Sequence, residues 1–217
     1  MAATRLLRTT AVGAFVTLSV SGCFTGERPT FENQDTIVVD EGSTGSVDID
    51  AVLERLERVG LASFTADYTI ETRFGALTSR ATVVQGEGDR SAVVVERDAG
   101  TTRFAESSDS ETTCDVITGE CESSLNDARI SDVGIPHTFY GPSFARRLRV
   151  SADRRIADSS AYPKTIAGQD ARCVDVTVSG GTETFCALDS GVLAEFVGAD
   201  VTVTLDEYSP VADEALL

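Results

Sequence analysis

The sequence predicts an α+β domain in which a long antiparallel sheet of about ten strands packs against two helices. The chain has 217 residues, of which 41% are hydrophobic, and this suits one domain with a sizeable core. Apolar and polar residues alternate over residues 64–71 and 201–206, and the connections between the expected strands are short, which favours antiparallel pairing over parallel crossovers. Only two segments follow the apolar stripe of a helix.

The first helix is expected just before residue 60, where apolar residues recur at helical spacing. Its stripe consists of Ile49, Val52, Leu53, Leu56 and Val59. Ser46 or Asp48 can cap its start, and Gly60 suits its end. We expect this helix to pack on the sheet, which requires no partner protein.

A series of strands follows the first helix. In the first of them Phe64, Ala66, Tyr68 and Ile70 alternate with polar residues, so one face is expected to be buried and the other exposed to solvent. Further strands are expected at 77–85, 90–97, 101–106 and 111–117. Their short connections, rich in Gly, Asp and Ser, favour an antiparallel meander.

The second helix follows a turn region at residues 136–142. Pro142 suits the first helical position, and the helix is expected to run to about Asp153, or in two pieces to Asp158. Strands resume after Pro163, at about 164–168, 170–178, 182–189, 191–197 and 200–208. An acidic tail begins at Ser209.

The N-terminus has the pattern of an export signal. Arg5 and Arg8 precede an uncharged run of roughly 14 residues, which is shorter than the about 20 that a membrane-spanning helix needs. The run ends in Val20-Ser-Gly-Cys23, which resembles a bacterial lipobox, in which Cys23 receives diacylglycerol and becomes the first residue. The alternative is an ordinary secretory signal with an incidental cysteine.

This pattern predicts three parts and a location. Residues 1–22 are the lipoprotein signal peptide, 23–47 are the lipidated cysteine and a flexible acidic tether, and 48–217 are a single domain. An alternative is that Ile37-Val-Val39 forms an edge strand of the domain. The lipid on Cys23 would hold the protein on the extracytoplasmic side of the cell membrane.

The remaining four cysteines are expected to form two structural disulfides, as is usual in exported domains. A two-residue turn at Ser179-Gly180 places Cys173 directly opposite Cys186 in a hairpin, and the same count pairs Cys114 with Cys121. A metal site and a redox pair are the alternatives. The single His and the absence of a CxxC motif count against a metal site. A redox pair is disfavoured because no two cysteines have the close spacing that lowers a thiol pKa.

Composition excludes several function classes. A formal net charge of −17 argues against binding to nucleic acid, and one His rules out a multi-His metal site. The chain has no nucleophile elbow, Walker loop, dinucleotide fingerprint or HExxH motif. Nothing near His137 supplies both a nucleophile and an orienting acid. We therefore expect no enzymatic activity, no cofactor and no bound metal.

One cationic cluster interrupts this acidic chain. It consists of Arg146, Arg147, Arg149, Arg154 and Arg155. Guanidinium groups suit phosphate and carboxylate, so Arg146, Arg147 and Arg149 are candidates for contact with an anionic headgroup. The alternative is a solvated helix face whose arginines pair with neighbouring Asp and Glu.

The predicted sheet has a large apolar face, and we expect two helices of about 12 residues to leave part of it uncovered. Uncovered concave apolar surface usually means a ligand cavity or a partner face. The candidate residues on this face and on the helix above it are Phe64, Tyr68, Ile70, Val93, Val95, Phe104, Phe144, Leu148, Val174 and Phe185.

The order of these elements resembles the LolA/LolB/LppX-like superfamily over about residues 49–208. The resemblance rests on a helix, the segment Phe64-Thr-Ala-Asp-Tyr-Thr-Ile70 opening a meander, a mid-chain helix, and the paired segments Cys173-Val-Asp-Val176 and Phe185-Cys-Ala-Leu-Asp-Ser-Gly-Val-Leu193. It implies a twisted half-barrel with helices across its concave face. The lipobox, with Lys164 as the sole lysine, fits lipid-anchored members from high-GC bacteria.

The resemblance implies an envelope lipoprotein that binds or carries an apolar ligand, a lipid or glycolipid, in the half-barrel cavity. We expect the protein to be a monomer. The alternative is a non-catalytic module with a filled core that binds another envelope protein. An empty, lined cavity would favour the first hypothesis, and a fully packed concave face would favour the second.

Overall fold

The computed structural model describes residues 42–73 and 75–217. The predicted signal peptide, the lipidation of Cys23, most of the tether and the alternative strand at 37–39 lie outside the described residues. No helix among the described residues is long and apolar enough to cross a membrane.

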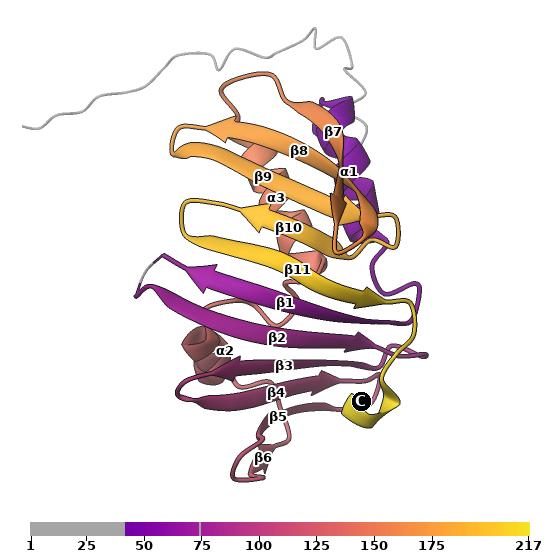
Figure 1. The fold of residues 1–217 in the computed structure, drawn as a ribbon, viewed down its shortest axis with the longest axis vertical. Helices are drawn as coiled ribbons and strands as arrows, with labels where there is room; N and C mark the ends of the chain where they lie inside the picture. Colours follow the sequence, from indigo (N-terminus) through magenta and orange to yellow (C-terminus); the bar gives the residue numbers. More distant parts are fainter. Residues whose placement is uncertain (1–41, 74) are drawn as a thin grey trace, which may run out of the picture. The chain divides into compact units, whose positions relative to one another are not determined.

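The described residues form an α+β fold built on one 11-stranded sheet in which all neighbouring strands are antiparallel (Figure 1). The strands are β1 (Phe64–Thr72), β2 (Leu77–Gln85), β3 (Ser91–Arg97), β4 (Gly100–Glu106), β5 (Glu111–Asp115), β6 (Cys121–Glu122), β7 (Ser160–Ile166), β8 (Gln169–Val178), β9 (Gly181–Leu188), β10 (Leu193–Val197) and β11 (Val201–Ser209). The predicted fold class, a twisted antiparallel half-barrel with helices on one face, is confirmed.

The first and the last strand meet in the middle of the sheet. The strand order is β6-β5-β4-β3-β2-β1-β11-β10-β9-β8-β7, so two meanders join along the β1–β11 pair. The register of this pair shifts after Asp67↔Glu207, because Tyr68 pairs with Leu205 and leaves Asp206 as a bulge. Figure 1 shows the junction as the change from purple to yellow strands.

Three α-helices accompany the sheet in the part of the chain that the structure describes. They are α1 (Val47–Glu57), α2 (Asp127–Val133) and α3 (Pro142–Asp153), and a 3-10 turn, η1 (Glu214–Leu216), ends the chain. Helix α1 contacts β7, β8, β9 and α3, whereas α2 lies beside the other meander (Figure 1). Ser46 caps α1 by accepting a hydrogen bond from the Ile49 amide, as predicted.

The structure corrects two details of the predicted elements. Helix α2 was not predicted, although Asn126 caps its start and Gly134 ends it with a φ of 72°. Strand β7 begins at Ser160, before Pro163, where the sequence placed a break. Proline is tolerated there because β7 is an edge strand and has no second neighbour to which an amide must donate.

Both edges of the sheet are short or interrupted. One edge is β7, which contains Pro163 and Lys164. The other edge is β6, which has two residues and is closed by the disulfide of Cys121. Such edges offer few free backbone groups to another strand.

Candidate functional site

Both predicted disulfides are present, and both join residues directly opposite each other in the sheet. The Cα atoms of Cys114 and Cys121 are 4.1 Å apart, and those of Cys173 and Cys186 are 4.0 Å apart. The two pairs differ in burial, since Cys173 and Cys186 are fully buried whereas Cys121 is exposed. Each disulfide therefore cross-links one meander internally.

The residues predicted to line a ligand cavity lie in the packed core. All ten are 4% exposed or less. The ring of Phe185 lies 4.9 Å from that of Phe196, which in turn lies 4.5 Å from Phe144. Tyr68 contacts Phe139 edge-on at 5.0 Å between ring centroids. The concave face is thus filled with the protein's own side chains.

A segment between α2 and α3 covers the part of the concave face that the two predicted helices leave open. Ile135, Phe139 and Tyr140 of this segment are buried in the core. The Leu193 amide donates to the Tyr140 carbonyl at 2.7 Å, and the Tyr68 hydroxyl donates to the Leu193 carbonyl at 2.9 Å. Burial raises the pKa of Tyr68 well above its usual value, so this hydroxyl keeps its proton. Residues 136–142 of this segment were predicted only as a turn region before the second helix.

The candidate headgroup arginines are engaged with the protein itself to different degrees. Arg147 donates two hydrogen bonds to the Asp200 carboxylate, at 2.7 and 2.8 Å, and one to Glu183 at 2.7 Å. Its guanidinium also lies 4.3 Å from the ring centroid of Phe196. Arg149 pairs with Glu57, and the exposed Arg146 donates to the Ser143 hydroxyl at 3.1 Å. Arg147 and Arg149 therefore fasten α3 to its neighbours.

The paired hydrogen bonds between Arg147 and Asp200 predict a pH-dependent contribution to the free energy of unfolding. The Arg147 hydrogen bonds hold the pKa of Asp200 below its usual range, although partial burial opposes them. Because the folded pKa is lowered, this stabilisation is present above the unfolded pKa and is lost as pH falls through the folded pKa. Asp200→Asn should cost about 0.5–1 kcal/mol at pH 6, since solvent screens this half-exposed pair.

Urea unfolding at several pH values checks this prediction. The difference in stability between wild type and Asp200→Asn should shrink between pH 5 and pH 3. Asp109→Asn, an exposed acid in the β4–β5 turn, is the matched control. A difference that stays constant over this pH range would contradict the prediction.

His137 has the surroundings of a structural residue. Its Nε2 lies 3.4 Å from Glu106 Oε1, and its ring centroid lies 6.2 Å from that of Phe104. No group of three or more potential metal ligands occurs in the part of the chain that the structure describes. The described contacts of His137 thus supply a carboxylate and an aromatic ring but not the arrangement of a catalytic triad.

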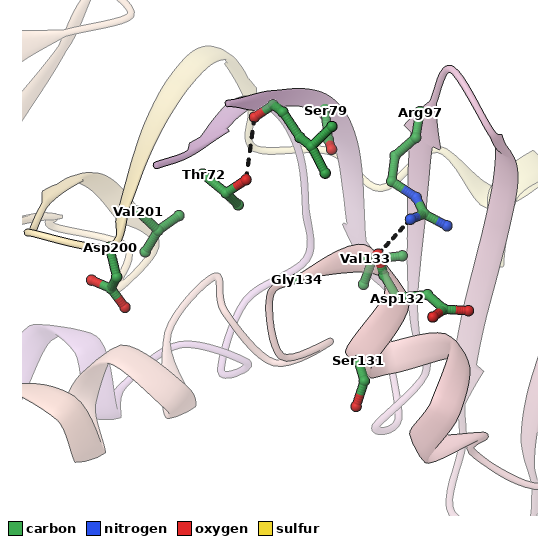
Figure 2. Close-up of a pocket in the computed structure, with 10 residues that line it drawn as sticks. Thr72, Ser79, Arg97, Ser131, Asp132, Val133, Gly134, Asp200 and Val201 are labelled. Atoms are coloured by element: carbon green, nitrogen blue, oxygen red, sulfur yellow. Dashed lines mark hydrogen bonds between the residues drawn. The ribbon is translucent and has the colours of Figure 1, made fainter. Parts of the chain in front are cut away.

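A pocket of about 310 Å³ opens where α2 approaches the ends of the central strands. Figure 2 shows its residues converging from β1, β2, β3, β11 and α2. The lining residues are Thr72, Leu77, Ser79, Arg97, Ser131, Asp132, Val133, Gly134, Asp200 and Val201. None of them was among the predicted ligand residues, because only the strand order brings these distant segments together.

Arg97 is the cation of this pocket. It is half-buried at the end of β3, on the same face as Ser79 and Val95. One of its terminal nitrogens donates to the Asp132 carbonyl of α2, as the dashed line in Figure 2 marks. Its Nε is buried and has no hydrogen-bond partner among the described residues. Arg97 thus combines a positive charge with unused donors.

Comparison with known proteins finds similarity among solved structures, at low sequence identity. No family model matches the chain, and no curated protein matches it. Among solved structures, a crystal structure of MucB aligns with a TM-score of 0.49 at 13% identity, covering 80% of this chain and 63% of that one. MucB in complex with MucA(peri) gives 0.48 at 11%, covering 78% and 59%.

A third structure, the MucA/MucB complex of Pseudomonas aeruginosa, gives a TM-score of 0.46 at 13% identity, covering 77% of this chain and 60% of that one. The chain spans about three fifths of the length of the solved structures that it matches. The architecture itself agrees with the half-barrel that the sequence resemblance implied.

Proposed function

We propose that this protein is a lipid-anchored, extracytoplasmic interaction module that binds another envelope protein and has no catalytic activity. The observation that carries the proposal is the filled concave face. All ten candidate ligand residues are 4% exposed or less, so a bound acyl chain would have to displace core side chains. A packed core leaves the outer surface as the place where binding occurs.

The anchor and the location follow from the N-terminal pattern. Lipidation of Cys23 would fix the chain to the membrane, and the acidic tether would let the domain reach a partner. The carbonyl of Gly42 accepts a hydrogen bond from Arg149 of α3, and that of Thr44 accepts one from Arg155, so residues 42–44 are held against α3 and the residues just after it.

A carrier of lipid or glycolipid is the second candidate. It is favoured by the small buried surface of α2. This helix has seven residues, and Val133 is the one of them that is buried. If α2 and the segment after it moved away, the rings of Tyr68 and Phe104, which lie against Phe139 and His137 of that segment, would be uncovered. The carrier hypothesis therefore requires a rearrangement, whereas the interaction module uses the fold as it stands.

Native mass spectrometry of the full protein, extracted from its own membranes in mild detergent, separates the two candidates. We expect one mass, four hydrogens below that of the reduced chain because of the two disulfides, with a lipid attached at Cys23. A further lipid released by organic solvent would contradict the filled-core proposal. The Cys23→Ser variant is the control that should lose the covalent lipid alone.

Cross-linking in whole cells tests the interaction itself. The proposal expects a discrete cross-linked adduct of this protein with a second envelope protein. The same adduct should form after non-covalently bound lipid has been removed from the protein. Absence of any adduct, together with a non-covalently bound lipid in the mass spectrum, would favour the carrier hypothesis.

A further inference from the structure

We propose that the pocket beside Arg97 binds a carboxylate of the partner protein, together with a small aliphatic side chain next to that carboxylate. This inference rests on the proposed function, because it names the chemistry of the partner at one site. It assigns the recognition to a surface pocket, away from the packed concave core.

The carboxylate preference comes from the unused donors of Arg97. A guanidinium carries five N–H donors, and the structure gives this one a single hydrogen bond among the described residues, to the Asp132 carbonyl. No described carboxylate lies within ion-pair distance of it, whereas Arg147, Arg149 and Arg55 each have an acidic partner. A carboxylate accepts two parallel hydrogen bonds from such a group and neutralises its charge.

The unpaired Nε of Arg97 supports a carboxylate as the ligand. Arg97 Nε is buried without an acceptor among the described residues, and a buried unpaired N–H is costly. A small rotation of the side chain within the pocket would present Nε and the second terminal nitrogen along one edge. That edge has the spacing of a carboxylate's two oxygens.

The rest of the lining favours a small aliphatic group next to the carboxylate. Leu77, Val133 and Val201 supply apolar surface, and the hydroxyl of the buried Ser79 supplies a polar contact. Leu77 is 55% exposed, so a ligand that covers it buries surface now in water. A volume of about 310 Å³ is at the lower end for ligand pockets, which suits one or two side chains.

Two acids of the pocket oppose an anion to different extents. Asp200 accepts both of its short hydrogen bonds from Arg147, so its charge is largely offset. Asp132 is exposed at the rim and has no described ion-pair partner. Removing the charge of Asp132 should therefore strengthen carboxylate binding, and this gives the proposal a variant that gains affinity.

Binding of short peptides to the full chain in detergent micelles tests the proposal. The probes are Ac-Ala-Ala-Val with a free C-terminal carboxylate, Ac-Ala-Glu-Val-amide, and the neutral Ac-Ala-Gln-Val-amide. The first two distinguish a C-terminal from a side-chain carboxylate. Titrations are followed in ¹H–¹⁵N spectra that resolve both backbone amides and arginine Nε–H groups.

At least one acidic probe should shift the Arg97 Nε–H resonance and the amides of Ser79 and Val133, and the neutral probe should bind at least tenfold more weakly. Arg97→Gln should weaken binding at least tenfold, and Arg97→Lys by a smaller factor because it keeps the charge but loses the fork. Asp132→Asn should tighten binding two- to fivefold. Arg80→Gln, on the opposite face of the sheet, is the matched control and should change nothing.

Equal binding of the neutral and acidic probes would overturn the proposal, and so would unchanged affinity in both Arg97→Gln and Asp132→Asn. These results are separable from the proposed function. If the whole-cell adduct forms as well with Arg97→Gln as with wild type, the interaction module stands and the pocket is not its recognition site. If no adduct forms with wild type while acidic probes still bind at Arg97, the pocket stands without the protein partner.

Discussion

Phe185→Ala is expected to destabilise the protein by about 4 kcal/mol, the largest effect of any single substitution considered. Phe185 is fully buried on β9, opposite Val174 of β8 and 4.9 Å from the ring of Phe196. Truncating a packed phenylalanine removes its burial and leaves a cavity, which together cost about 3–5 kcal/mol. Urea unfolding of the full chain, monitored by circular dichroism, measures the change.

This substitution also tests the function. A phenylalanine that lined an empty ligand cavity would lose few contacts on truncation, so its removal would change stability little. Val150→Ala, on the solvent side of α3 at 45% exposure, is the matched control and should cost less than about 0.5 kcal/mol. A loss below about 1 kcal/mol for Phe185→Ala would count against a filled core and revive the carrier hypothesis.

Replacing Cys173 and Cys186 together by alanine is expected to cost about 3 kcal/mol. The two residues are 13 positions apart, and cross-linking a loop of about 15 residues restricts the unfolded chain by about that amount. The sulfurs are fully buried on the outer side of the sheet, where Glu195 pairs with Lys164 beside them. The change therefore also removes packing that the surrounding strands cannot easily replace.

The second disulfide provides the comparison. Cys114 and Cys121 are 7 positions apart, and β6 is a two-residue edge strand that can open without the rest of the sheet. Their double alanine variant should lose less global stability than the Cys173/Cys186 variant, as measured by urea unfolding under non-reducing conditions. An equal or larger loss at the edge would mean that β6 is coupled to the central strands.

The regular elements of the fold were predictable because their patterns are local. Alternation over residues 64–71 and Pro142 at a helix start each depend on neighbouring residues, and the structure has β1 and α3 at those positions. The disulfide between Cys173 and Cys186 was predictable for the same reason, since one turn at Ser179-Gly180 sets the register.

The elements that were missed depend on contacts between distant residues. Helix α2 has seven residues and only Val133 buried, so it carries no apolar stripe, and the caps at Asn126 and Gly134 were its only signal. Pro163 signalled a break because its place at a sheet edge depends on the strand order.

The candidate site was beyond sequence analysis for a related reason. Arg97 and Asp132 come from separate elements, and Val201 lies about a hundred residues from the first of them. Nothing in the spacing of these residues indicates that they meet. By contrast, the arginine cluster of α3 stood out in the sequence, yet Arg147 serves mainly to hold Asp200 and Glu183.

The meeting of β1 and β11 in the middle of the sheet has a consequence for how the chain assembles. Each meander is built from strands that follow one another, and each has its own disulfide, so both halves can mature before they meet. The seam between them has no covalent link and pairs residues more than a hundred positions apart. Contacts of such long range form slowly. The seam can therefore close only after β11, the last strand of the sheet in chain order, has been synthesised.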